Sequence, residues 1–196
     1  MNNLERKFKY AQKGSFAHDY DGVDCTDVDK ELWGNLTVEG YKFLGCGGAN
    51  FCLVSADKDE VISVPMVSVN GVTDRLIMWK ASQLEPHNPH LPELEMLFDG
   101  MAFRAPFYEI NSLGWISCLS VLAISDLLLS LKHDQEIFSN SAPVSLHTAK
   151  LAIENAARSL GVEDDFAWDF TEENFGIDVD GNIVLIDPIC PNGLRS

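Results

Sequence analysis

The sequence predicts an α+β fold in which strands and helices are segregated along the chain. Between residues 41 and 110, short apolar segments alternate with glycine-containing or polar turns, a pattern typical of antiparallel strands. After residue 113, two long apolar segments have helical character, and one short strand pair follows them. We therefore expect one compact unit with an acidic arm at 1–40, a β-rich lobe at 41–112 and a helical lobe at 113–196.

The composition argues against several classes of function. The chain has 196 residues and is 46% hydrophobic, enough to bury a real core. Its 30 acidic and 14 basic residues give a formal net charge of −16, which disfavours direct binding to nucleic acid or to an anionic membrane. Such a charge suits a protein partner with a basic surface. The five cysteines lack CxxC spacing and the N-terminal residues lack an apolar signal core, so we expect reduced thiols in the cytoplasm.

Five strands and one helix are expected in the first lobe. The segments YKFLG, FCLVSA and VISVPMVSV are joined by tight turns, so they predict three antiparallel strands. Leu76, Ile77 and Leu84 have helical spacing within residues 73–84, and the prolines that follow end this helix. The segments PELEMLFDG and AFRAPFYEI alternate enough to predict a fourth and a fifth strand.

Two apolar helices are expected in the second lobe. Residues 113–131 match the length of a bilayer span, but the internal Asp126 and four serines favour a buried core helix; a membrane helix is the alternative. Residues 144–160 predict the second helix, which ends at Gly161. Four of its residues fall on one apolar stripe: Leu146, Ala149, Ile153 and Ala157.

A short hairpin is predicted by the segment FGIDVDGNIVLIDP, in which Asp180-Gly181 joins two apolar strands. Asp169 and Asn174 precede this hairpin, and Asp187 ends it, so the turn would bring Asp187 back beside Asn174. An Asp in this pattern can orient or deprotonate a hydroxyl, and an amide oxygen with a second carboxylate can hold Mg²⁺. An ordinary acidic turn is the other interpretation.

Three glycines form a second motif, because Gly45, Gly47 and Gly48 lie between the first two expected strands. Glycine lets the backbone approach phosphate groups closely and present N–H donors to them. Taken alone, the motif is better explained as a glycine-containing hairpin of no special function.

Together, the segments YKFLGCGGANFCLV, WDFTEENFGID and GNIVLIDP resemble the protein-kinase-like fold. The sequence is most similar to the small protein kinases made early in infection by short-tailed bacteriophages. The resemblance covers Tyr41 to Pro188 and implies a minimal two-lobed fold with a truncated helical lobe, since only eight residues follow Pro188. It implies ATP and Mg²⁺ as cofactors, with Asp169 accepting the substrate's hydroxyl proton and Asn174 and Asp187 holding the metal.

The same resemblance implies roles for the glycine motif and for the connection between the lobes. Gly45, Gly47 and Gly48 would cover the phosphates, and the backbone of Asn111 and Leu113 would bind adenine. The implied activity is transfer of phosphate from ATP to Ser or Thr of host proteins, in the host cytoplasm, during takeover of the cell.

Two departures from the kinase pattern point to an alternative function. Ser63 stands where the third strand of a kinase carries a phosphate-binding Lys, and the helix at 73–84 has no Glu to pair with such a Lys. We interpret Asp74 as a favourable charge at the start of that helix. Without the Lys–Glu pair, the chain is alternatively a catalytically inactive pseudokinase scaffold.

The acidic surface gives this alternative a mode of action. Between Glu154 and Asp187 there are ten acidic residues and one Arg. Such a face would attract Mg²⁺ and a basic substrate, or would bind and inhibit a basic host protein, for example a polymerase, a nuclease or a defence complex. A solvated acidic surface with no specific role is the remaining interpretation. The sequence predicts no particular oligomeric state.

Overall fold

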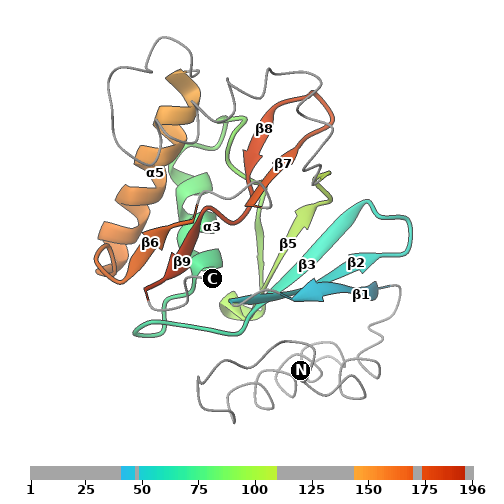
Figure 1. Cartoon of the computed structure of the whole chain (residues 1–196), viewed down its shortest axis with the longest axis horizontal. Coiled ribbons are helices and arrows are strands. Elements are labelled where there is room, and N and C mark those ends of the chain that lie inside the picture. Colours follow the sequence, from blue (N-terminus) through green and yellow to red (C-terminus); the bar gives the residue numbers. More distant parts are fainter. Residues whose placement is uncertain (1–40, 47–48, 110–143, 170–173, 193–196) are drawn as a thin grey trace. The chain divides into compact units, whose positions relative to one another are not determined.

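The computed structural model describes residues 41–46, 49–109, 144–169 and 174–192 (Figure 1). The chain has an α+β fold, as predicted. The described residues divide into two compact units, one built from those up to 68 with 94–107, and the other from 69–93 with those from 108 onward. The helix that we assigned to the first lobe from sequence therefore packs within the second unit.

An antiparallel five-stranded sheet forms the first unit, with strand order β1-β2-β3-β5-β4. The five predicted strands are thus present in the described chain. Their bounds are β1 (Tyr41–Cys46), β2 (Asn50–Ser55), β3 (Glu60–Pro65), β4 (Glu95–Leu97) and β5 (Ala102–Pro106).

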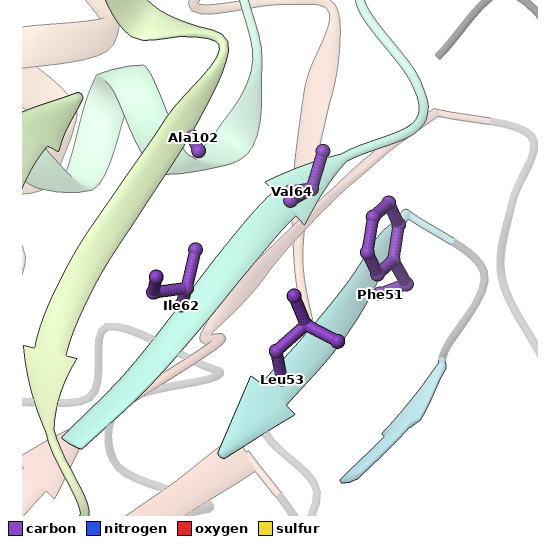
Figure 2. Close-up of a cluster of buried hydrophobic side chains, with 5 residues drawn as sticks. All are labelled: Phe51, Leu53, Ile62, Val64 and Ala102. Carbon is purple, nitrogen blue, oxygen red and sulfur yellow. The ribbon is translucent and has the colours of Figure 1, made fainter. Parts of the chain in front are cut away.

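The core of this unit comes from residues that alternate along β2 and β3. Phe51 lies opposite Val64 and Leu53 lies opposite Ile62, so all four side chains share one face of the sheet. Figure 2 shows them with Ala102 of β5. Each of the five is at most 2% exposed, and burial of this face stabilises the pairing register of the sheet.

The fourth strand is shorter than predicted. We expected a strand over residues 92–100, but β4 covers only Glu95–Leu97 and a single 3₁₀ turn, Phe98–Gly100, follows it. Phe98 and Asp99 have φ angles of 51° and 56°, in the left-handed region. A strand cannot continue through that conformation, so the chain turns there and enters β5.

In the described part of the second unit, helix α3 (Asp74–Leu84) packs against helix α5 (Val144–Leu160). The Thr73 hydroxyl caps α3 by accepting a hydrogen bond of 3.1 Å from the Leu76 backbone N–H. The bounds of α5 are those predicted, and its four-residue stripe is buried. The predicted helix at 113–131 lies outside the described residues, and no described helix is long and apolar enough to cross a bilayer.

Two small strand pairs complete the second unit. The predicted hairpin is present as β7 (Phe175–Ile177) paired with β8 (Ile183–Leu185). A second pair joins β6 (Phe166–Trp168) to β9 (Ile189–Pro191), and we did not predict it from sequence. These strands have three residues each and lie on either side of the hairpin, so no local turn motif marks their pairing.

The buried side chain of His90 links the hairpin to α5. Its Nδ1 donates to the Ile183 carbonyl at 2.7 Å, and its Nε2 lies 2.9 Å from the Ser145 hydroxyl. The backbone carbonyl of His90 also accepts the Leu185 N–H at 2.9 Å. Because β8 leads directly to Asp187, these three bonds help to fix where Asp187 lies.

Candidate functional site

The turn of the hairpin is built around the Asp178 carboxylate. This carboxylate accepts backbone N–H groups from Asp180 and Asn182 and the side-chain amide of Asn182. Gly181 has a φ of +84°, which glycine adopts without steric cost. Partial burial opposes ionisation of Asp178, but the hydrogen bonds from its turn hold its pKa below the ordinary value. The acidic turn is therefore a structural element that sets the pairing of β7 with β8.

The three polar residues singled out from sequence are joined by hydrogen bonds. The backbone N–H of Asp187 donates to the carbonyl of Asn174 at 3.2 Å, and that of Ile186 donates to the same carbonyl at 2.9 Å. The side-chain amide of Asn174 donates to the Asp169 carbonyl at 2.7 Å. The Asp169 N–H donates in turn to the Pro188 carbonyl at 2.8 Å. The second unit thus brings Asp169, Asn174 and Asp187 together.

The Asp187 carboxyl lies in a strongly acidic and partly buried environment. Its side chain is 32% exposed, but its Oδ1 is buried and accepts no hydrogen bond within the described part of the chain. Burial raises the pKa of Asp187 to about 7; the Arg75 guanidinium opposes this effect, and the Asp74 and Asp169 carboxyls add to it. A divalent cation at this carboxylate would favour its ionised form.

Arg75 and Asp74, in the first turn of α3, reach this carboxyl from another part of the unit. Arg75 Nη2 lies 3.5 Å from Asp187 Oδ2, and Arg75 Nη1 donates to the Ile186 carbonyl at 2.6 Å. Asp74 is 1% exposed. Besides placing a negative charge at the start of α3, it interacts with the Asp187 carboxyl. Our interpretation of Asp74 as a helix-terminal charge was therefore incomplete.

Two side-chain oxygens at this position are of the kind that can bind a magnesium ion. Asp187 Oδ1 is a buried oxygen that has no hydrogen-bond donor among the described residues. The Asn174 amide nitrogen is engaged with Asp169, which leaves the amide oxygen as the side-chain atom able to bind a cation. No described group of three or more His, Cys, Asp or Glu residues is arranged to hold a metal. Two protein oxygens completed by phosphate and water oxygens are a set that Mg²⁺ commonly uses.

The remaining predicted site residues fall in the first unit or outside the description. Gly45 lies in β1 beside an irregularity in its pairing with β2. Ser63 is buried in β3, and its hydroxyl donates to the Phe103 carbonyl at 3.5 Å. Gly47, Gly48, Asn111 and Leu113 lie outside the described residues.

Sequence reasoning missed Arg75. The sequence pattern directed attention to a Glu on the helix at 73–84, and it gave Arg75 no role. Arg75 lies in the first turn of α3, directly after the capping Thr73 and Asp74. The signal that could have identified it is the apolar surroundings of its helix turn, since a buried Arg needs an acidic partner.

Comparisons with known proteins add no family to this description. No protein-family model matches the chain, and no curated protein matches it at a significant level.

Proposed function

We propose that this chain is a kinase-like phosphotransferase that uses ATP and Mg²⁺ to phosphorylate Ser or Thr hydroxyls of a protein partner. One observation carries the proposal: Asp169, Asn174 and Asp187 are linked by hydrogen bonds although the sequence separates them by up to 18 residues. A base for the hydroxyl proton and two oxygen ligands for the metal are the side chains that phosphoryl transfer needs.

Each side chain has a distinct role in the proposed reaction. Asp169 accepts the proton of the attacking hydroxyl as the new oxygen–phosphorus bond forms. The bond between the γ-phosphorus and the β–γ bridging oxygen breaks, and ADP carries away the electron pair. Asn174 and Asp187 hold Mg²⁺, which when bound neutralises negative charge on the phosphates. Asp187 is fixed for this role by its backbone bond to Asn174 and by Arg75.

A second function is favoured by one specific observation. Ser63 is 5% exposed and its hydroxyl is directed to the Phe103 carbonyl, so β3 presents no cation at the position where kinases carry one. The alternative is a pseudokinase whose acidic surface binds and inhibits a basic host protein. A basic protein would bind in either case. The two functions therefore differ only in whether phosphate is transferred to it.

The test is a transfer assay with γ-labelled ATP, Mg²⁺ and a histone mixture as a basic acceptor. We expect label in the acceptor with the wild-type chain and at least a 100-fold loss with Asp169→Asn, because removal of a general base costs that much. The control is Asp165→Asn, which changes a nearby acidic residue outside the hydrogen-bonded set. Acceptor binding without label transfer would overturn the kinase proposal and support the pseudokinase.

A further inference from the structure

Arg75 makes an unusual pair of contacts for a residue in the first turn of a helix. It is 5% exposed, so its charge has been removed from water and needs compensation. One arm of its guanidinium donates to the Ile186 carbonyl at 2.6 Å, and the other lies 3.5 Å from Asp187 Oδ2. The two consecutive residues that follow β8, Ile186 and Asp187, are thus contacted by one rigid, planar group.

The helix that carries Arg75 is itself well anchored within the second unit. Thr73 caps its N-terminus, and the Asp74 carboxylate accepts the Arg75 backbone N–H at 2.8 Å. α3 also packs against α5, and its residues Ile77 and Met78 are fully buried. The guanidinium is therefore presented from a fixed base, which is the requirement for orienting another side chain.

We propose that Arg75 is a positioning residue for Asp187, the carboxylate that would bind the metal. The inference rests on the proposed function, because it assigns the purpose of Arg75 to the metal ligand. By binding the Ile186 carbonyl, Arg75 fixes the backbone that carries Asp187. By facing Oδ2, it leaves the buried Oδ1 as the oxygen that would bind the metal.

The contacts of Arg75 would leave Asp187 able to bind Mg²⁺ beside the guanidinium. The guanidinium is committed to the Ile186 carbonyl at a short, charge-assisted distance, whereas its approach to Oδ2 is longer than a hydrogen bond. The carboxylate is therefore oriented by Arg75 and keeps a coordinating oxygen. A purely structural ion pair would stabilise the unit in the same way, and experiment separates the two roles.

The experiment measures ATP affinity by calorimetry at several Mg²⁺ concentrations and in EDTA. The variants are Arg75→Lys, which keeps the charge but loses the fork, and Arg75→Met, which loses both. Arg104→Met is the matched control, since Arg104 pairs with Glu95 on the exposed sheet of the first unit. Circular dichroism and melting temperature are recorded for each variant, so that affinity is compared only among folded proteins.

We expect both Arg75 variants to bind ATP in EDTA with the wild-type affinity. The factor by which Mg²⁺ increases the affinity for ATP should be at least 10-fold smaller in both variants than in the wild type. Arg104→Met should keep the wild-type factor. Unchanged or stronger Mg²⁺ dependence in Arg75→Lys would overturn the inference, and Arg75→Lys decides alone if Arg75→Met does not fold. If the wild-type chain shows no Mg²⁺-dependent binding, the proposed function fails instead, which distinguishes the two failures.

Discussion

Asp187 affects the stability of the chain and is also a metal ligand in the proposed function. Its pKa of about 7 reflects burial first, with Arg75 opposing and Asp74 and Asp169 adding to the rise. The folded chain therefore holds a proton between about pH 4 and 7 that the unfolded chain releases. The stabilising effect of this proton is complete below the unfolded pKa and is lost as the pH rises through the folded pKa.

The corresponding prediction compares the wild type with Asp187→Asn. The difference in the free energy of unfolding, wild type minus variant, should fall as the pH rises from 4 to 7 and level off above 7, measured by urea denaturation. Asp178→Asn is the matched control with the opposite sign, because the pKa of Asp178 is lowered and its contribution is lost below pH 4. A difference for Asp187→Asn that is constant from pH 4 to 8 would contradict the assigned environment.

At the scale of single elements, loss of the N-terminal cap of α3 should lower the stability of the chain more than loss of an exposed side-chain hydrogen bond in α5. Thr73→Ala removes the acceptor of the Leu76 N–H and should lower the free energy of unfolding by about 1 kcal/mol. Thr148→Ala, at an exposed bond within α5, should change it by less than about 0.5 kcal/mol. Equal losses in the two variants, measured by chemical denaturation, would argue against a specific role for the cap.

The hairpin offers a second test at this scale, at Gly176 of β7. A Cβ added there would lie 2.5 Å from Ile186 Cδ1 and 2.6 Å from Tyr108 Cβ, both too close for carbon atoms. Gly176→Ala should therefore cost about 1–3 kcal/mol of stability and disturb the residue before Asp187. Gly45→Ala, with nothing within 4 Å and no left-handed φ, is the control for a strand glycine. A fully stable Gly176→Ala chain would contradict this close packing.

Elements with a strong local pattern could be predicted from the sequence. The stripe on α5 and the Asp180-Gly181 turn define their structures within a few residues, because helix period and turn chemistry are local properties. The pairing of β6 with β9 could not be predicted, since both strands are three residues long and their contact depends on the whole unit. β4 ends early because Phe98 and Asp99 have left-handed φ angles. Neither residue is a glycine, so the sequence gives no sign of this conformation.

At the scale of the whole molecule, the sequence predicted which residues form the candidate site better than it predicted the contacts that hold them in place. Asp169, Asn174 and Asp187 could be grouped because a short hairpin joins two of them. Arg75 lies over 100 residues away from Asp187, and its role depends on how α3 packs in the second unit. Such a contact carries no local sequence signal, so it emerges only from the tertiary structure.

The acidic character of the chain also belongs to this scale. The net charge of −16 is compatible with a basic protein as acceptor in the kinase proposal and as target in the pseudokinase alternative. Charge therefore does not discriminate between the two functions, whereas the fate of the nucleotide does.

The measurement that tests the central claim most directly is a thermal shift with ATP, with and without Mg²⁺, on the wild type and on Asp187→Asn. We predict a rise in melting temperature with ATP and Mg²⁺, since ligand at 100 times its Kd adds about 2.7 kcal/mol of stability. The Mg²⁺-dependent part of the rise should vanish in Asp187→Asn. No shift of the wild type at millimolar ATP and Mg²⁺, or an equal shift in the variant, would contradict a metal-assisted nucleotide site at Asp187.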